Sequence, residues 1–151
     1  MTSNAVSVIL PVLNEEDYLV HAVEAILQQK FTGQIEVLLA IGPSVDRTME
    51  IAQELAKNDS RVRIIENPSG RTAAGLNLAI KNSKYPVIVR VDGHSNIPEN
   101  YIELAAQLLE KTGAVNVGGL MAAEGRTPFE RAVAGAMRSP LGVGAAKFQD
   151  R

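Results

Sequence analysis

The chain has 151 residues, of which 46% are hydrophobic and 21% charged, a composition typical of one ordinary globular domain. It contains no cysteine, which excludes disulfide scaffolds, cysteine-ligated metal centres and thiol nucleophiles. Lysine and arginine number 15 against 17 aspartates and glutamates, and with a net charge of −2 we expect no nucleic-acid partner. Since the sequence shows neither a signal-peptide pattern nor an apolar run long enough to span a membrane, we expect a cytoplasmic protein.

Short β-branched apolar runs alternate with amphipathic stretches along the chain, which predicts repeated strand–helix units. Five strands are expected, at Val6–Pro11, Ile35–Ile41, Val62–Glu66, Val87–Val91 and Val115–Leu120. Such nearly continuous apolar runs are typical of parallel strands that are buried on both faces. The predicted fold is therefore α/β, a doubly wound, mostly parallel sheet sandwiched by helices.

Four helices are expected between these strands. The first has an apolar stripe within Leu19–Leu27, with Asn14 as its cap and the acidic residues 15–17 in its first turn. In the fourth, Pro98 takes the first helical position and Gly113 ends the helix.

The fourth strand runs directly into Asp92, Gly93 and His94. In extended backbone Asp92 and His94 would project to the same side, with Gly93 leaving room for a ligand. A carboxylate and an imidazole suit a divalent cation such as Mn²⁺. An ordinary turn into a helix capped by Ser95 or Asn96 explains the same residues, and on spacing alone it is the better explanation.

Other polar side chains follow the strands, and ligands of such sheets bind beyond the carboxyl ends of the strands. Arg71 begins the third helix, where the helix dipole disfavours a cation unless an anion lies nearby, although an exposed arginine covering the surface is an equal alternative. Glu15 is either an acceptor for base or ribose hydroxyls or a helix-start carboxylate. Arg90 shares a face with Asp92 and is expected to pair with a carboxylate, and Asp46 is expected to cap a helix.

Several other site chemistries are not supported. The chain lacks the phosphate-binding patterns G-x-x-x-x-G-K-[ST] and G-x-G-x-x-G after the first strand, and a G-x-S-x-G elbow with a histidine partner. A receiver-type phosphoacceptor domain needs a lysine after its last strand, which Leu120–Ala123 does not provide. A sugar nucleotidyltransferase would begin with a glycine-rich loop bearing a basic residue, unlike Pro11–Glu15.

Four segments occur in order at the expected strand ends: Val6–Glu16, Ser44–Thr48, Asn67–Asn77 and Val91–His94. Together they resemble the family 2 glycosyltransferases of the GT-A fold, and within that family the succinoglycan-type bacterial glucosyltransferases. The combination is far more specific than any one segment, and it reverses the preference for a simple turn at Asp92 and His94.

The resemblance implies roles for particular residues. Those expected to contact the nucleotide are Pro11, Asn14, Glu15, Arg71 and Asp92. Asp92 and His94 would hold the divalent metal, Mn²⁺ or Mg²⁺, with His94 where the usual Asp-x-Asp motif has its second acid. A second departure lies at Ile41–Pro43, where many members carry an acid that reads uracil.

The implied activity is metal-dependent, inverting transfer of a sugar from a nucleotide diphosphate sugar, with UDP preferred, to a polysaccharide or lipid-linked acceptor. Residues 1–120 would form the nucleotide-sugar-binding domain, and residues 121–151, a Gly/Ala-rich tail, would begin the acceptor-binding half. No residue is assigned as the catalytic base. A non-catalytic nucleotide-binding or regulatory module is the alternative, and peripheral association with the inner face of the cell membrane and a homodimer are left open.

Overall fold

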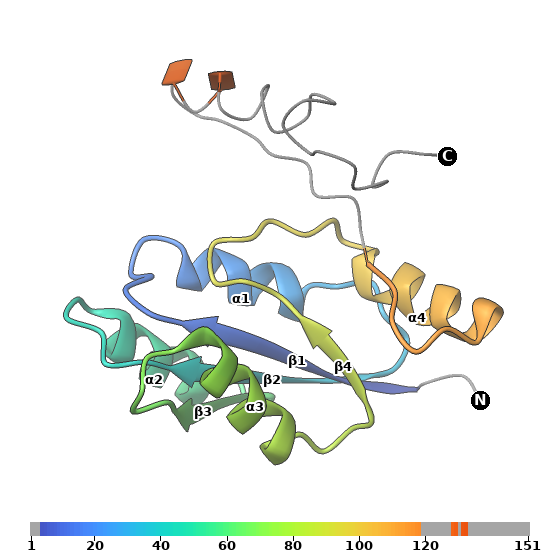
Figure 1. The fold of residues 1–151 in the computed structure, drawn as a ribbon, viewed down its shortest axis with the longest axis horizontal. Helices are drawn as coiled ribbons and strands as arrows, with labels where there is room; N and C mark the ends of the chain where they lie inside the picture. Colours follow the sequence, from blue (N-terminus) through green and yellow to red (C-terminus); the bar gives the residue numbers. More distant parts are fainter. Residues whose placement is uncertain (1–3, 119–127, 130, 133–151) are drawn as a thin grey trace. The chain divides into compact units, whose positions relative to one another are not determined.

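The computed structural model describes residues 4–118, 128, 129, 131 and 132. The chain divides into two compact units, residues 1–115 and 116–151, and all the strands and helices named below lie in the first (Figure 1). They are, in chain order, β1 (Ala5–Val12), α1 (Leu19–Leu27), β2 (Gln34–Ile41), α2 (Thr48–Asn58), β3 (Val62–Glu66), α3 (Thr72–Asn82), β4 (Val87–Arg90) and α4 (Tyr101–Thr112). In the second unit, the described residues 128, 129, 131 and 132 are helical.

The sheet has four parallel strands in the order β3-β2-β1-β4. Val8 lies at its centre, opposite Val37 of β2 and Val89 of β4. The first four predicted strands are confirmed to within one residue at each end. The strand order places β1 and β2 inside the sheet, which is why their apolar runs are the longest.

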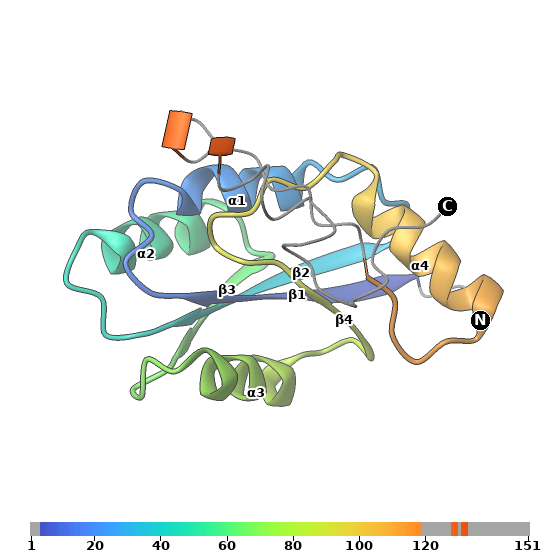
Figure 2. The same ribbon diagram turned by 45° about the horizontal axis from the view of Figure 1, so that its top comes forward.

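Helices cover both faces of the sheet, as predicted, and Figure 2 shows α3 on the face opposite α1 and α2. Side chains alternate along each strand, so Val8 and Leu10 of β1 pack with Ile26 of α1 on one face. On the other face Ile9 packs with Ala79 of α3. Burying each large aliphatic side chain contributes about 1.5–3 kcal/mol, so this two-sided burial is the main source of stability.

The fifth predicted strand, Val115–Leu120, is wrong in its described part, since residues 115–118 are not in a strand. Gly113 ends α4 in the left-handed conformation, with φ 64°, and Val115 is fully exposed. An apolar alternation becomes a strand only when a neighbouring strand pairs with it, and within the described residues nothing pairs with this segment. Residues 119 and 120 lie outside the described part, as does most of the predicted tail.

The helix starts also differ from the prediction. Asn14 does not cap α1, because it has a positive φ of 53° and the helix begins at Leu19, after a turn in which Tyr18 N–H donates to the Glu15 carbonyl (3.0 Å). Acidic residues 15–17 therefore precede the first turn of α1. Pro98 is likewise not the first residue of α4, since its carbonyl accepts from Tyr101 N–H one turn earlier (3.0 Å). Gly113 ends α4 as predicted.

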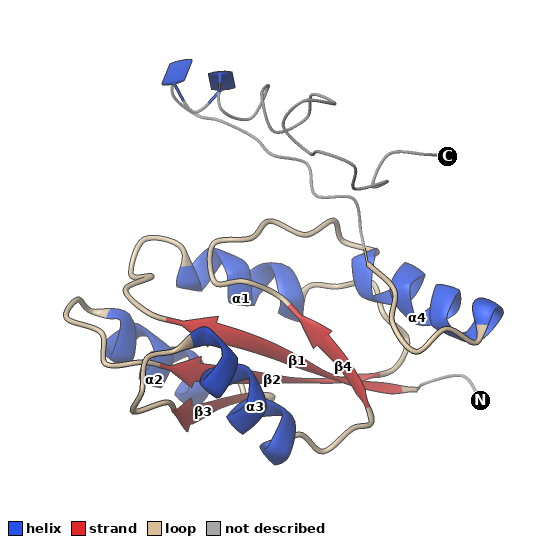
Figure 3. Cartoon of the chain, in the orientation of Figure 1, coloured by secondary structure: helices blue, strands red, loops and turns tan. Residues whose placement is uncertain are grey.

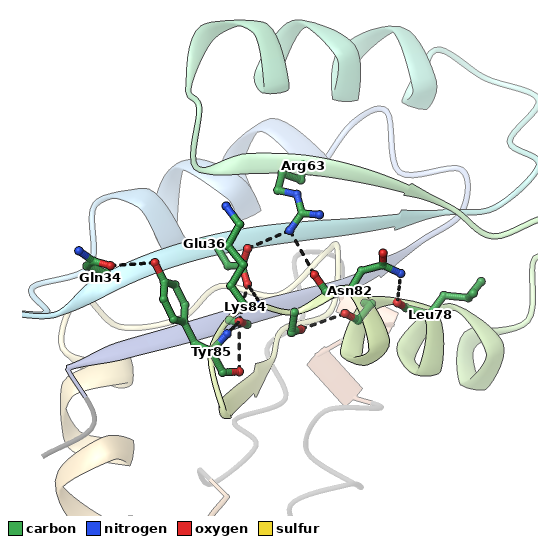
Figure 4. A network of polar contacts seen from close by, with 10 residues as sticks. Gln34, Glu36, Arg63, Leu78, Asn82, Lys84 and Tyr85 are labelled. Carbon is green, nitrogen blue, oxygen red and sulfur yellow. Dashed lines mark hydrogen bonds and ion pairs between the residues drawn. The ribbon is translucent and has the colours of Figure 1, made fainter. Parts of the chain in front are cut away.

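A buried polar network joins β1, β2 and β3 to the start of β4 (Figure 4). Glu36 accepts hydrogen bonds from Ser7 Oγ (2.6 Å), from the Lys84 amide (2.5 Å) and from Arg63 Nη1 (3.1 Å). Tyr85 N–H donates to Ser7 Oγ (3.1 Å). Burial raises the pKa of Glu36, but these hydrogen bonds outweigh it and hold the pKa below its usual value. The network fixes the register at which β4 joins the sheet.

The longest described helix, α4, has 12 residues. Across the described part of the chain, no helix has the length and apolar character needed to cross a membrane.

Candidate functional site

Because the strands are parallel, the loops that follow them gather at one edge of the sheet. Figure 3 shows these loops in tan beyond the arrowheads of the strands. They are residues 13–18 after β1, 42–47 after β2, 67–71 after β3 and 91–100 after β4. All the predicted site residues lie in these loops, except Pro11, which is in β1 opposite Ala40 of β2.

The loop after β1 is held by the loop after β2. Asn14 N–H donates to Ser44 Oγ (3.1 Å), and Asn14 Oδ1 accepts from Val45 N–H (2.9 Å). Glu15 N–H donates to Oγ1 of Thr48 (2.8 Å), a residue that is fully buried. Asparagine tolerates the left-handed backbone better than most residues, which explains its place at this bend.

Asp46 lies next to the start of α2 but, contrary to the prediction, is not its N-cap residue, because Arg47 holds that position and makes no side-chain cap hydrogen bond. Its carboxylate accepts from the Thr48 amide (3.0 Å) and from Glu16 N–H (3.3 Å). The hydrogen bond from the Thr48 side chain is the largest cause of a lowered pKa of Asp46. Arg47 N–H in turn donates to Glu16 Oε2 (3.1 Å), so the two loops are cross-linked in both directions.

The residues after β4 form a turn rather than extended backbone. Ser95 N–H donates to the Asp92 carbonyl (2.9 Å), and Gly93 and His94 lie within the turn. The prediction that Asp92 and His94 share a side because the strand continues is therefore wrong in its geometry. The alternative that Ser95 or Asn96 caps α4 is also wrong, because Asn100 precedes the first residue of that helix.

Asp92 pairs with Arg90, which confirms the expected partner for that arginine. Arg90 Nε donates to Asp92 Oδ1 (3.0 Å), and both side chains are about half exposed, at 54% and 40%. A pair this exposed contributes little to stability. It does engage one carboxylate oxygen, and no described residue engages the other, Oδ2.

Glu15 and His94, 79 residues apart in sequence, are brought together. Nδ1 of His94 lies 2.9 Å from Oε1 of Glu15. The Glu15 side chain is only 15% exposed, whereas that of His94 is 64% exposed. Gly93 packs on the same carboxylate, since a Cβ there would lie 3.2 Å from Glu15 Cγ. The space expected beside Gly93 for a ligand is thus occupied by Glu15.

Arg71 is the residue before the first turn of α3, as predicted, and is exposed. Within the described residues its guanidinium has no hydrogen-bond or ion-pair partner, so it is not paired with Glu15, Asp92 or His94. The loop before it is shaped by Gly70 (φ 64°), where a Cβ would lie 3.1 Å from Cδ of Pro43. Arg71 is therefore presented from a loop that lies against the loop after β2.

Over residues 4–118, 128, 129, 131 and 132, no group of three or more histidine, aspartate or glutamate side chains is arranged to hold a metal ion. Asp92 and His94 therefore offer two ligands at most. A cavity of about 300 Å³ lies near the amino end of β2, lined in part by Phe31, Arg61 and Tyr85, and none of the predicted site residues lines it. We place the candidate site at the loop edge because the polar side chains of the loops converge there.

The sequence interpretation missed Thr48 and Ser44 as residues that hold Asn14 and Glu15. Both lie in the segment Ser44–Thr48, in which the sequence alone predicts a role only for Asp46. Thr48 is the first residue of the amphipathic helix α2, and the backbone amides at such a position are often hydrogen-bonded by water. The sequence therefore did not indicate that Thr48 would be fully buried.

The fold and this edge define an α/β protein with a polar site built on the loops after four parallel strands. Residues 7–144 match the model of the family described as Glycosyl transferase family 2, so the chain belongs to that family.

Two curated relatives are similar to this chain over most of its length. The chain is 32% identical to the succinoglycan biosynthesis protein ExoA of Rhizobium meliloti, over 99% of this chain and 46% of that protein. It is 36% identical to the glycosyltransferase GlyG of Streptococcus pneumoniae, over 77% of this chain and 39% of that protein. The chain thus spans less than half the length of these two relatives.

Solved structures of TarS from S. aureus have the same fold as this chain. TarS 1-349 in complex with UDP gives a TM-score of 0.64 at 21% identity, covering 78% of this chain and 38% of that one. The complex with UDP-GlcNAc gives a TM-score of 0.61 at 22% identity, covering 78% of this chain and 37% of that one. The predicted GT-A architecture is confirmed by this likeness.

Proposed function

We propose that this chain binds a nucleotide diphosphate sugar, with UDP as the nucleotide, and forms the donor-binding part of an inverting glycosyltransferase. The acceptor would be a polysaccharide or a lipid-linked glycan. The observation that carries the proposal is the exposed turn at Asp92 and His94, placed beside Glu15 at the carboxyl edge of the sheet in a member of glycosyl transferase family 2. UDP is favoured because TarS, which shares the fold, has been solved with UDP and UDP-GlcNAc.

The residues of the turn fit a divalent cation, Mn²⁺ or Mg²⁺. Asp92 Oδ2 and His94 Nε2 are engaged by no described residue, while their companion atoms Oδ1 and Nδ1 are held by Arg90 and Glu15. A mixed carboxylate and imidazole pair suits Mn²⁺ and leaves coordination positions for diphosphate oxygens. Such a cation supplies charge stabilisation to the departing diphosphate.

The other predicted donor-binding residues have distinct parts in the proposal. Arg71, an exposed cation at the start of α3, would pair with the diphosphate. Pro11 and Asn14 would line the nucleotide side of the site, where the hydrogen bonds that Asn14 donates to Ser44 Oγ and accepts from Val45 N–H hold Asn14 in place. Glu15 is predicted to face the nucleotide, and its contact with His94 gives it a second role.

The proposed acceptor class is supported by the relatives alone. ExoA is a succinoglycan biosynthesis protein, and a polysaccharide acceptor is the corresponding proposal for this chain. Transfer also needs a base to deprotonate the attacking hydroxyl. No described residue is proposed for that role.

Thermal unfolding of the full chain with a nucleotide panel tests the proposal. UDP, GDP and ADP are compared, each with Mn²⁺ and with chelator. A ligand at 100 times its Kd stabilises the folded state by about 2.7 kcal/mol, a shift of several degrees in Tm.

We expect the shift with UDP and Mn²⁺, its loss in Asp92→Asn, and its retention in Asp17→Asn, which changes an exposed aspartate of the same loop region. A chain that no nucleotide stabilises would refute donor binding and favour a non-catalytic module. Stabilisation by GDP alone or by ADP alone would show that the proposed nucleotide, UDP, is wrong and that the donor carries a different base.

A further inference from the structure

We propose that Glu15 is a positioning residue for His94. Its carboxylate fixes the imidazole as the Nδ1–H tautomer and orients the ring, so that the lone pair of Nε2 is presented to a divalent cation. The inference rests on the proposed function, in which Asp92 and His94 hold that cation, but its first test needs no metal.

The tautomer follows from the chemistry of the contact. Nδ1 of His94 and Oε1 of Glu15 are 2.9 Å apart, a hydrogen-bond distance. A carboxylate only accepts hydrogen bonds, so the proton of this bond belongs to Nδ1. A neutral imidazole has a single N–H, which leaves Nε2 with its lone pair free for a metal.

Glu15 is the fixed partner of the two. Its backbone N–H is held by the buried Thr48 hydroxyl (2.8 Å), and its side chain is 15% exposed. Gly93 closes against it, since even a Cβ at that position would come within 3.2 Å of Glu15 Cγ. His94, at 64% exposure, has no other partner in the described part of the chain and would otherwise rotate in solvent.

The arrangement has the form of a metal-binding histidine backed by a carboxylate. A carboxylate that accepts from the second ring nitrogen sets the tautomer and raises the basicity of the ligating one. Asp92 is held in a similar way, because Arg90 hydrogen-bonds to its Oδ1 and no described residue hydrogen-bonds to its Oδ2. The two candidate ligands are therefore each held on one atom and open on the other.

The direct test is nitrogen-15 NMR of the histidine rings in the metal-free chain, at a pH where both rings are neutral. The sequence has only two histidines, and His21→Asn assigns the signals. We expect His94 as Nδ1–H, and exposed His21 with the Nε2–H preference of a free imidazole. In Glu15→Ala, His94 should take the same preference as His21, and Glu15→Gln, which keeps an acceptor oxygen, should restore part of the Nδ1–H population.

A His94 ring that is already Nε2–H in the unaltered chain overturns the inference, and so does one that Glu15→Ala leaves as Nδ1–H. Preserved circular dichroism of each variant separates this result from misfolding.

The second test measures Mn²⁺ affinity in the presence of UDP. Loss of a carboxylate behind a metal-binding histidine typically weakens metal affinity about 10- to 100-fold, and we expect that loss for Glu15→Ala. Glu24→Ala, on an exposed position of α1, should leave the affinity unchanged. Equal affinity in Glu15→Ala and the unaltered chain contradicts the positioning role. Absence of Mn²⁺ binding in the unaltered chain instead refutes the proposed function, while the tautomer measurement still decides the contact itself.

Discussion

Replacing Glu36 tests whether the buried network holds the sheet together. In Glu36→Ala the Lys84 amide and the Ser7 hydroxyl lose an acceptor at a part-buried site, and each such loss costs about 1–3 kcal/mol. Arg63 also loses its carboxylate, but its side chain is 34% exposed and water can take over its hydrogen bond. We therefore expect a total loss of about 3–5 kcal/mol at pH 7, the size measured when one partner of a buried pair is removed.

The pH dependence of this loss has a definite sign. The pKa of Glu36 is lowered in the folded chain from its ordinary value of 4.5, because three hydrogen bonds outweigh the effect of burial. A lowered folded pKa contributes stability that is present above 4.5 and is lost as the pH falls through the folded value. The difference between the unaltered chain and Glu36→Ala should shrink as the pH is lowered below 4.5.

Urea unfolding at a series of pH values measures both effects. Glu54→Ala, at an exposed position of α2, is the control and should change the free energy of unfolding by less than about 0.5 kcal/mol. A loss below about 1 kcal/mol for Glu36→Ala at pH 7 would refute the reasoning. So would a difference between the two chains that grows on acidification.

Three further substitutions address the site. Thr48→Val removes the hydroxyl that accepts from Glu15 N–H, and we expect urea unfolding to show a loss of about 1–3 kcal/mol. Gly93→Ala should displace the Glu15 side chain, since its Cβ would lie 3.2 Å from Cγ; NMR should then show His94 losing the Nδ1–H form while the fold is kept. Arg71→Ala should leave the free energy of unfolding unchanged, because the Arg71 side chain is exposed. It should weaken UDP binding, measured by calorimetry, about ten- to a hundredfold, which corresponds to the loss of one charged hydrogen bond. An unchanged affinity for UDP would show that Arg71 is not part of the site.

The sheet was predictable from the sequence because its signals are local. Runs such as Val6–Pro11 and Val62–Glu66 are apolar throughout, and burial on both faces of a parallel sheet needs that pattern. Gly113 ended a helix where the sequence indicated, since glycine takes the left-handed conformation at little cost. The strand expected at Val115–Leu120 failed in its described part because pairing with a neighbour, rather than local preference, decides whether such a run becomes a strand.

The contacts of the site depend on residues far apart in the chain. Asn14 has the composition of a helix cap, yet its partners are Ser44 and Val45 in the next loop, about 30 residues away. The carboxylate of Glu15 meets His94 across 79 positions. The sequence could place these residues at one edge of a sheet. Which of them are in contact depends on the conformations of the loops relative to one another, and no local sequence pattern encodes those.

Calorimetric titration of the chain with UDP, in Mn²⁺ and in chelator, tests the donor site most directly. The unaltered chain should bind UDP only when Mn²⁺ is present, and the double variant Asp92→Ala, His94→Ala should lose that binding while keeping its circular dichroism spectrum. Binding of the same strength in chelator, or retained in the double variant, would contradict a metal-assisted donor site at the turn after β4.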